Sequence, residues 1–587
     1  MATATEPAGA GAGLPDPGDP IRPPWTRQRA QLWTLGLLLL VLIPIGMWQT
    51  GMSPARLIQS VGDLANLVER MWPPRFDEWR RYVDELLVTV WMVIAGTALA
   101  IVFSVPLAVL AARNTTTGRI GYAVSRGIIV FTRSVPAIVF ALVFVRAIGI
   151  GPVAGVLAIG INSIGMVGKF YSDAIEEVDP GPVEAMKATG AGRLQVLVSA
   201  VLPQVLSGWI ALGLYRVDIN VRSAVILGYV GAGGIGLELQ RVQGQLAYSR
   251  VFAIVAIIFV LIVLVEQISN VVRRALLGAE DQGRKANPYR LTNRIRRQSE
   301  EDRAAAEATR QERYRRATAA GQLERGDTLR EPWGALRLRK WIFAGAGIVL
   351  TIISFGALDI SLRRYLDSVG DVGALLALMV PPDFTTNIAR TVTELSETFW
   401  IAITATGLGI LLSIPFALLG ARNVAPNRWA YRFSRFSMLA VRGIPELILA
   451  VLFVVAVGLG PFAGVLALTI GAIGLTGKLM ADALESLPLS KVQEGLTSTG
   501  ASWLQRTLTG VLPQAVPSMV GVGLYTFDVY IRAATILGIV GAGGIGNLLD
   551  STIGQRQFDR MAGVIILIFV IVYGVERFSG WLRQKLI

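Results

Sequence analysis

The chain carries much of its sequence twice, and this repetition constrains its fold more than any other feature. The heptapeptide Val-Gly-Ala-Gly-Gly-Ile-Gly occupies Val230 to Gly236 and returns unchanged at Val540 to Gly546. Other matches keep the same order at offsets of 309 or 310 residues: Ala112-Arg113-Asn114 with Ala421-Arg422-Asn423, Arg133 and Pro136 with Arg442 and Pro445, Gly168-Lys169 with Gly477-Lys478, and Val201-Leu202-Pro203-Gln204 with Val511-Leu512-Pro513-Gln514. A register kept over this length indicates two copies of one domain.

Composition indicates that these domains lie in a membrane. The 587 residues are 53% hydrophobic, and their mean hydropathy is +0.55. A segment of about 20 apolar residues is long enough to cross a bilayer. The sequence predicts six such spans in each copy, at 31–49, 86–111, 125–147, 152–172, 196–217 and 251–272, and at 340–358, 396–419, 433–457, 461–483, 506–527 and 561–580. We therefore expect an all-α integral membrane protein with about twelve transmembrane helices.

Basic residues in short loops predict the orientation of the spans, because Arg and Lys concentrate in cytoplasmic loops. In the first copy, basic residues lie before the first span, after the second, between the fourth and fifth, and after the sixth: Arg22, Arg27, Arg29, Arg113, Arg119, Arg126, Lys187, Arg193, Arg273 and Arg274. The loop at 50–85 is an exception, because its arginines mix with a similar number of acids. An even number of spans per copy makes the two copies parallel six-helix repeats, related by a pseudo-twofold axis along the membrane normal, with both termini cytoplasmic.

Four segments follow from this division. Residues 1–30 are predicted to be a disordered cytoplasmic tail, 31–275 the first membrane repeat, 276–338 a charged cytoplasmic linker and 339–587 the second membrane repeat. Residues 273–340 contain 18 basic and 10 acidic side chains. We interpret this stretch as a solvated tether, and the alternative is that its arginines contact anionic membrane lipid or a cytoplasmic partner. Because the stretch supplies much of the net charge of +14, nucleic acid is not an expected partner.

The residue types in the chain argue against an enzyme. It has no cysteine and no histidine, so no metal site of the usual kind, thiol nucleophile or histidine base is expected. It also has no phosphate-binding loop of the Gly-x-x-x-x-Gly-Lys-Ser/Thr type. The repeated glycines fit the dinucleotide-binding pattern, but that pattern needs a βαβ unit around it. Beside membrane spans, we expect these glycines to allow close packing or a bend on the outer side: Gly231, Gly233, Gly236, Gly541, Gly543 and Gly546.

The predicted cytoplasmic loop between the fourth and fifth spans carries a further repeated pattern. It comprises Glu184-Ala185, Gly190 and Leu202-Pro203 in the first copy, and Glu494-Gly495, Gly500 and Leu512-Pro513 in the second. The pattern resembles the EAA loop of ABC importer permeases, which in that family forms a short coupling helix seated in a groove of a cytoplasmic ATPase. We expect the acid to lie near the start of the helix, the glycine to end it and the proline to open the next span. The alternative is a capped surface helix without a partner.

Residues downstream narrow the resemblance. The run Leu214-Tyr215-Arg216-Val217-Asp218-Ile219-Asn220-Val221-Arg222, followed by Leu227-Gly228 and the glycine heptapeptide, is similar to the phosphonate/phosphite importer permease family. The second copy agrees at Leu524-Tyr525, Asp528, Arg532 and Leu537-Gly538, but it has Thr526 and Phe527 in place of Arg216 and Val217. The resemblance covers about 80–275 and 390–582. Because members of that family are usually single copies that pair, the chain resembles two subunits fused.

The resemblance implies a type I ABC importer permease fold and a set of partners. Two cytoplasmic ATPase subunits would bind ATP and Mg and dock at the EAA loops, while this chain would hold no cofactor itself. One extracytoplasmic binding protein would deliver phosphonate, phosphite or a related phosphorus oxyanion, and the location would be the bacterial inner membrane. The alternatives are a methionine- or sulfonate-type importer and a secondary transporter.

Charged side chains inside the predicted spans are candidates for a pathway or gate, because a charge in a membrane is unfavourable unless it is paired or lines a cavity. Two pairs lie four residues apart and can bond on one helix face: Asp218 with Arg222, and Asp528 with Arg532. Arg133 and Arg442 are candidates for contact with the oxyanion, and the alternative is that they extend to the membrane interface. We expect every acid within the spans to have a basic residue nearby, which argues against a secondary transporter because such a protein needs a coupling site.

Overall fold

The computed structural model describes residues 27–277, 335–358, 362–487 and 489–586. The first half contains α1 (Arg27–Gln49), α2 (Pro54–Met71), α3 (Trp79–Ala111), α4 (Arg119–Ser134), α5 (Ala137–Ile148), α6 (Pro152–Glu176), α7 (Pro180–Ala188), α8 (Arg193–Val196), α9 (Leu202–Leu227), α10 (Ile235–Gly244) and α11 (Tyr248–Leu277). The second half contains α13 (Ala335–Ala357), α14 (Leu362–Leu378), α15 (Ile388–Gly420), α16 (Arg428–Arg442), α17 (Glu446–Val457), α18 (Pro461–Glu485), α19 (Ser490–Ser498), α20 (Trp503–Arg506), α21 (Leu512–Gly538), α22 (Ile545–Gly554) and α23 (Phe558–Leu586). The predicted tail up to residue 26 and the linker over 278–334 lie outside the described residues.

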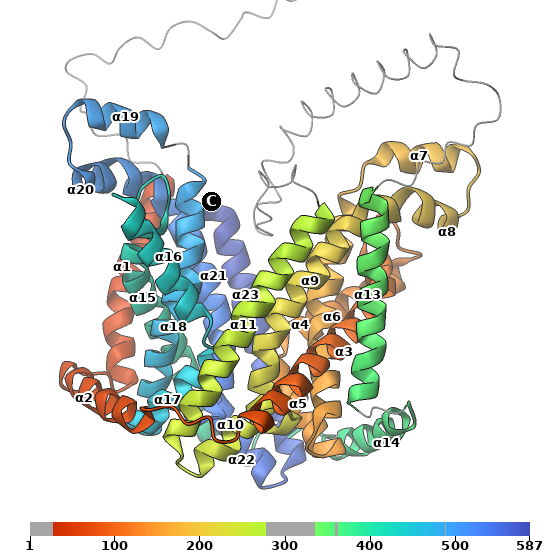
Figure 1. Cartoon of the computed structure of the whole chain (residues 1–587), viewed down its shortest axis with the longest axis horizontal. Coiled ribbons are helices and arrows are strands. Elements are labelled where there is room, and N and C mark those ends of the chain that lie inside the picture. The colour runs from red at the N-terminus through yellow and green to blue at the C-terminus, as the bar shows by residue number, and fades with distance from the viewer. Residues whose placement is uncertain (1–26, 278–334, 359–361, 488, 587) are drawn as a thin grey trace, which may run out of the picture.

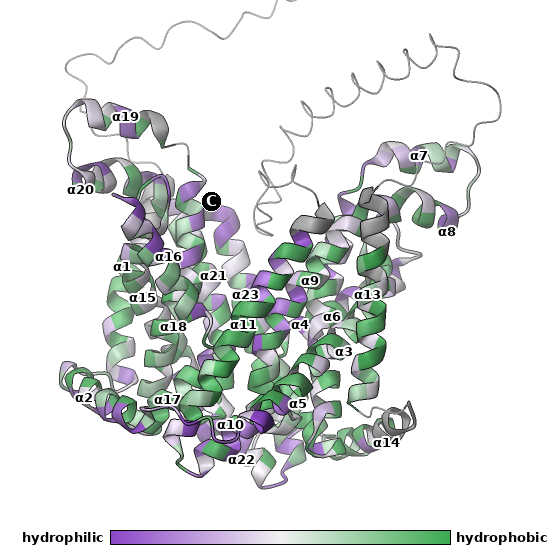
Figure 2. Cartoon of the chain, in the orientation of Figure 1, coloured by the Kyte–Doolittle hydropathy of each residue, from purple (hydrophilic) through white to green (hydrophobic). Residues whose placement is uncertain are grey.

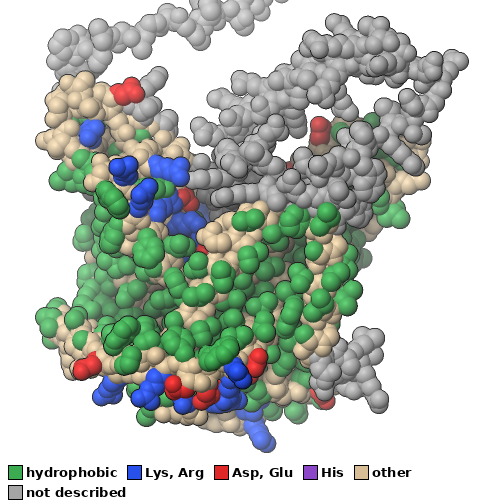
Figure 3. All heavy atoms as spheres, in the orientation of Figure 1, with side chains coloured by type: hydrophobic (Ala, Val, Ile, Leu, Met, Phe, Trp, Pro, Cys, Tyr) green, Lys and Arg blue, Asp and Glu red, His purple; other side chains and the backbone are tan. Residues whose placement is uncertain are grey.

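The two halves repeat one order of helices in one direction. In Figure 1, α7 and α19 lie at one end of the molecule and α10 and α22 at the other, and we name these the α7/α19 end and the α10/α22 end. Among the described residues, eight helices are long and apolar enough to span a membrane, and three bent pairs bring the count to as many as eleven. Hydrophobic residues fill the band between the ends (Figure 2), and charged side chains gather at the α10/α22 end of the face in Figure 3. The prediction of two parallel all-α membrane repeats is confirmed.

The third predicted span of each half differs from the sequence analysis. Instead of single spans at 125–147 and 433–457, α4 and α5 meet at 90° and α16 and α17 meet at 80°. Pro136 and Pro445 directly precede α5 and α17. A proline has no N–H to donate and its ring clashes with the preceding turn, so one helix ends and another begins. The predicted segments are apolar as expected, but each is broken into two helices, and the breaks place Arg133 and Arg442 at the ends of α4 and α16.

The first helix of each half packs against the other half. In Figure 1, α1 lies beside α15 and α13 beside α3. The α1–α15 contact is close, since a Cβ at Gly46 would lie 2.1 Å from Thr404 Oγ1 and one at Gly407 would lie 2.4 Å from Ile43 Cγ1. α2, which occupies part of the predicted loop at 50–85, bends 63° from α1 and contacts α17. The ranges 31–275 and 339–587 therefore describe the sequence repeat. They do not describe two separate packing units, because the first helix of each range packs against the other range.

Candidate coupling and translocation sites

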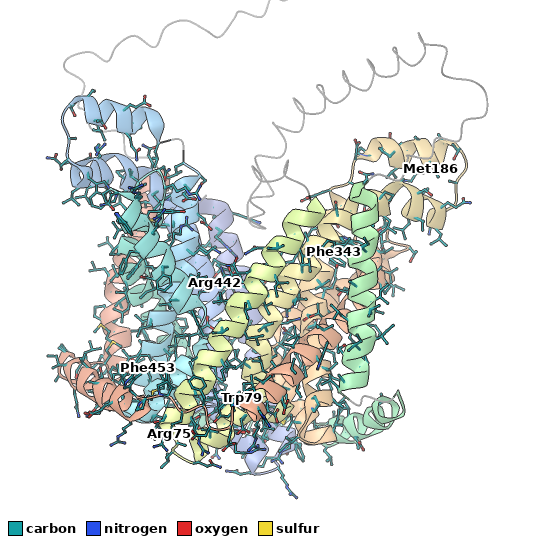
Figure 4. All side chains as sticks on the ribbon, viewed as in Figure 1. Arg75, Trp79, Met186, Phe343, Arg442 and Phe453 are labelled. Carbon is teal, nitrogen blue, oxygen red and sulfur yellow. The ribbon has the colours of Figure 1, made fainter. Side chains whose placement is uncertain are left out.

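The two EAA-like loops form short helices that project from the α7/α19 end (Figure 1). Glu184 and Ala185 are exposed on α7, and their counterparts Glu494 and Gly495 are exposed on α19; Figure 4 labels their neighbour Met186. Each helix stops at a glycine with a φ of +76°, a conformation that glycine adopts without strain: Gly190 and Gly500. Their N–H groups donate to Lys187 O and Thr497 O, each at 3.0 Å. The glycines therefore end the helices and turn the chain back toward the membrane bundle.

Two details of the loop differ from the sequence analysis. Glu184 is the fifth residue of α7 and not part of its first turn; the acid at the helix start is Asp179, which accepts from Gly181 N at 3.0 Å. Pro203 is the second residue of α9, as expected, but α8 and a π-helical turn run directly into α9, so the helical segment already begins at Arg193. A wider π-helical turn at Leu197–Val201 precedes the proline. Such a turn accommodates a residue that disturbs the regular hydrogen-bond ladder.

The repeated heptapeptide forms the connection from α9 to α10, and from α21 to α22, at the α10/α22 end. Several of its glycines have positive φ values: Gly231 (+102°), Gly233 (+85°), Gly541 (+84°) and Gly543 (+80°). A Cβ at Gly236 would lie 2.1 Å from Val225 O, and one at Gly546 would lie 2.0 Å from Thr535 O. In the described structure helices both precede and follow the motif, so the strand of a dinucleotide-binding fold is missing there. The glycines make a tightly packed hairpin.

Four charged side chains meet between the halves inside the bundle. Arg442, at the end of α16 in the second half, lies 3.7 Å from Asp218 and 3.6 Å from Glu266 of the first half. Arg222 lies 3.6 Å from Asp218 and 3.5 Å from Glu266. All four side chains are less than one-fifth exposed, and Figure 4 places Arg442 near the middle of the bundle. The predicted Asp218–Arg222 pair is therefore part of a larger group that crosses between the halves.

The equivalent residues of the other repeat form two ion pairs. Arg133, at the end of α4, forms an ion pair with Glu576 on α23 of the second half. Arg532 lies 3.0 Å from Asp528, one helical turn away on α21. The predicted Asp528–Arg532 pair is present, and each arginine at a helix break contacts the last helix of the other half. We name the residues of these two groups the inter-half charges: Asp218, Arg222, Glu266 and Arg442 in one, and Arg133, Asp528, Arg532 and Glu576 in the other.

The sequence analysis did not single out Glu266 and Glu576. Each is a lone acid within an apolar run in the sixth span of its copy, and the two lie 310 residues apart. An acid at the same position of both apolar runs is a signal that marks the pair, because an intramembrane carboxylate usually has a specific partner. The partner could not be read from spacing, since it lies in the other half.

Glycines allow neighbouring helices to pack closely against Arg133 and Arg442, which we name the break arginines because they end α4 and α16 at the helix breaks. A Cβ at Gly165 on α6 would lie 2.5 Å from Arg133 N, and a Cβ at Gly474 on α18 would lie 2.6 Å from Arg442 N. Contacts this short are sterically forbidden, so only glycine permits the two helices to approach the ends of α4 and α16 so closely. The backbone of each arginine is thereby fixed against the neighbouring helix, and its side chain extends toward the other half.

Comparison with known proteins identifies the family. The model of the binding-protein-dependent transport system inner membrane component matches residues 104–277 and 409–587. The chain belongs to this family. It is 41% identical over 543 residues, 92% of this chain and 93% of the relative, to the phosphate-import permease protein PhnE of Mycolicibacterium smegmatis. It is 40% identical over 251 residues, 43% of this chain and 90% of the relative, to the phosphite transport system permease protein PtxC of Stutzerimonas stutzeri.

A solved structure of the MetNI methionine ABC transporter in an inward-facing conformation matches the permease with a TM-score of 0.31 and 24% identity, over 34% of this chain and 97% of that chain. Membership of the family makes the chain a multi-pass inner-membrane permease, a transport subunit and not itself an enzyme. Permeases of this family operate with an ATPase and a binding protein.

The permease uses its repeated Ala-Arg-Asn motif to join helix ends. The backbone N–H of Arg113 donates to Glu176 Oε1 at 3.0 Å, and Arg126 reaches the same carboxylate at 2.8 Å. The second half repeats both contacts at the same distances, with Arg422 and Arg435 on Glu485. The motif therefore ties the end of α3 to α6, and that of α15 to α18, next to the projecting helices.

One acid inside the spans of the permease corrects an expectation. Glu446 is the first residue of α17 and is half-buried, and among the described residues none forms an ion pair with it within 4.0 Å. Arg442, the nearest basic residue in sequence, binds Asp218 and Glu266 instead. The expectation that every intramembrane acid has a basic partner was wrong for Glu446. Family membership, and not this expectation, now excludes a secondary transporter.

Proposed function

We propose that the permease forms the translocation pathway of an ATP-driven importer for phosphonate, phosphite or a related phosphorus oxyanion. The relatives named for phosphate import and for phosphite transport, at 41% and 40% identity, support this class of cargo. The observation that carries the mechanism is the pair of ion contacts between halves, Arg442 with Asp218 and Glu266, and Arg133 with Glu576. They lie where two parallel halves meet, which is where a symmetric pathway forms.

The inter-half charges act as a gate in this proposal. Charges within a membrane are strongly disfavoured when separated, and pairing offsets much of that cost. Because each break arginine and its acid belong to different halves, any motion that parts the halves must break these contacts. While these ion pairs are formed, the pathway is closed at the depth where they lie, and the ATPase supplies the free energy to open it.

The α7/α19 end faces the cytoplasm in this proposal, and both termini lie on that side. The exposed Glu184 and Glu494, on two helices that project from the bundle, support docking of one ATPase subunit at each helix. ATP and Mg would be held by those subunits, and the chain would hold no cofactor or metal. One binding protein would dock at the opposite, α10/α22 end and deliver the oxyanion there.

Reconstitution tests the proposed function. Proteoliposomes would contain the full-length permease, its ATPase and its binding protein, with ATP supplied on the ATPase side. We expect uptake of phosphite, phosphate or a phosphonate and stimulation of ATP hydrolysis by the loaded binding protein. Uptake of methionine or a sulfonate, with none of any phosphorus oxyanion, would contradict the proposal.

A further inference from the structure

The first half holds an arginine that has no acidic partner. Arg216 on α9 is 6% exposed. Its Nε donates to Ser163 Oγ at 2.9 Å and one terminal nitrogen donates to Asn162 Oδ1 at 2.8 Å, while the other lies 3.0 Å from the sulfur of Met166. All three partners are neutral, and no carboxylate in the described residues lies within 4.0 Å of the guanidinium. Because a guanidinium stays protonated in proteins, this part of the membrane bundle carries an uncompensated positive charge.

The partners of Arg216 are themselves held at the α4–α5 break. The side-chain amide of Asn162 donates to Val135 O at 3.2 Å, a carbonyl directly before Pro136. Ser163 is also bonded to the amide of Asn220 at 3.1 Å. Hydrogen bonds from amides and hydroxyls thus fix a cationic group beside the helix break, which also positions Arg133 for its contact with the other half.

The second half has different chemistry at the same place. The counterparts of Arg216, Asn162 and Ser163 are Thr526, Gly471 and Ala472. Thr526 bonds to the hydroxyl of Thr476 at 2.9 Å, so the side chain that replaces Arg216 is neutral. Ala137 of the first half is replaced by Glu446, and a Cβ at Gly471 would lie 3.4 Å from Glu446 Cγ. One location, seen in two repeats, is therefore cationic in the first half and anionic in the second.

We propose that Arg216, with Asn162 and Ser163, binds the transported oxyanion in the first half only, and that Glu446 excludes it from the second. This inference rests on the proposed function, because it takes the cargo to be a phosphorus oxyanion. A guanidinium offers two parallel donors to such an anion, and a thioether sulfur is a weak acceptor that an oxyanion readily replaces. The amide of Asn220 donates to Thr97 and Ser163 and so holds the partners of Arg216 in place. The anion then binds once per chain and to one side of the pseudo-twofold axis.

The inter-half charges connect this site to the gate. Asn162 also lies 3.5 Å from Thr132 O, and Thr132 directly precedes Arg133 in the chain. The Arg133–Glu576 contact therefore lies next to Asn162 in the chain's fold, on the side of α4 that faces the other half.

Equilibrium binding of radiolabelled inorganic phosphate to the purified full-length permease tests this site without relying on transport. We expect one phosphate per chain for the wild type, binding about tenfold weaker for Arg216→Lys, and none for Arg216→Met. Thr526→Val, at the matching position of the second half, is the control and keeps one phosphate per chain. Two phosphates per chain, none in the wild type, or unchanged binding by Arg216→Met would each overturn the site.

Uptake measured in parallel separates this site from the proposed function. Gel filtration first tests whether Arg216→Met is folded. If it is not, the binding of phosphate by Arg216→Lys is used to judge the site. If wild-type proteoliposomes import phosphite or phosphate but the purified permease binds none, only this site is wrong. If the wild type neither imports nor binds any phosphorus oxyanion, the proposed function is wrong as well.

Discussion

The two halves of the permease share the features of the proposed coupling helices and gate, and they differ at the proposed anion site. Both halves have the glycine-terminated projecting helix, the broken third span and an arginine that reaches the last helix of the other half. At the helix break, by contrast, the first half has Arg216 and Asn162, and the second has Thr526 and Glu446. Features that are repeated in both halves therefore surround a helix break whose chemistry differs between them. The comparison teaches that fusion of two copies lets one half specialise without disturbing the mechanics shared by both.

The projecting helices also differ in how they are held. Asp179 and Gln204 connect the start of α7 to α9, with Asp179 N donating to the Gln204 side chain at 2.9 Å. On the other side, the side chains of Gln493 and Trp503 donate to Asn423 O and Val424 O, each at 2.7 Å. The first helix is thus tied to its own following span, and the second to the α15–α16 connection. Unequal anchoring predicts unequal coupling to the two ATPase subunits.

The largest expected effect comes from the acids of the projecting helices. Glu184→Ala and Glu494→Ala should weaken ATPase docking to different extents, the larger about 30-fold, since a residue central to an interface contributes roughly 2 kcal/mol. The double variant should abolish uptake while the spans stay folded. Uptake in proteoliposomes and co-purification of the ATPase measure this. Full transport by the double variant would refute the coupling role, and equal single effects would remove the asymmetry between the two helices.

A smaller effect is expected from charge-preserving changes at the helix breaks. Arg133→Lys and Arg442→Lys keep the charge but lose the two-pronged geometry, so uptake should fall about tenfold while expression stays normal. The two variants should behave alike, because both arginines contact the last helix of the other half. Uptake at the wild-type rate in both would remove these arginines from the gate.

Stability should respond to the glycines that face those arginines. Gly165→Ala and Gly474→Ala force a methyl group against the backbone of Arg133 and Arg442, which should cost about 1–3 kcal/mol each. Gly208→Ala is the matched control, because no atom lies within 4 Å of its added Cβ. Thermal unfolding in detergent measures the difference. If the control lowers the melting temperature as much as the other two, the close approach is not what requires glycine.

The smallest expected effect concerns the cap of α7. Asp179→Ala removes the side chain that accepts from Gly181 N and should destabilise the helix start by about 1 kcal/mol. Amide hydrogen exchange in α7 should then be about fivefold faster. Exchange in α19 should not change, because Asp179 caps α7 only and the start of α19 has no side-chain cap. Faster exchange in both helices would contradict the separate anchoring of the two.

Local patterns predicted much of this structure, and contacts between distant segments were not predictable. The apolar runs located the spans, and the four-residue spacing of Asp218 and Arg222 predicted their pairing. The break at Pro136 was missed because a proline within an apolar run of span length is tolerated in membrane helices when neighbours satisfy the freed groups. The contacts of Arg442 with Glu266 and of α1 with α15 were missed for another reason. An offset between repeats shows that two segments are equivalent, but it does not show which of them lie side by side.

The gate between the halves can be tested most directly by fixing it closed. The chain has no native cysteine, so cysteines at positions 259 and 443 can be joined specifically by a short thiol-reactive linker. These positions lie on α11 and at the end of α16, where a Cβ at Gly443 would be 2.5 Å from the ring of Phe259. We expect the Phe259→Cys/Gly443→Cys variant to transport before treatment, to bind its ATPase in both forms and to lose uptake once linked. Undiminished uptake by the linked permease would contradict a pathway that opens between its two halves.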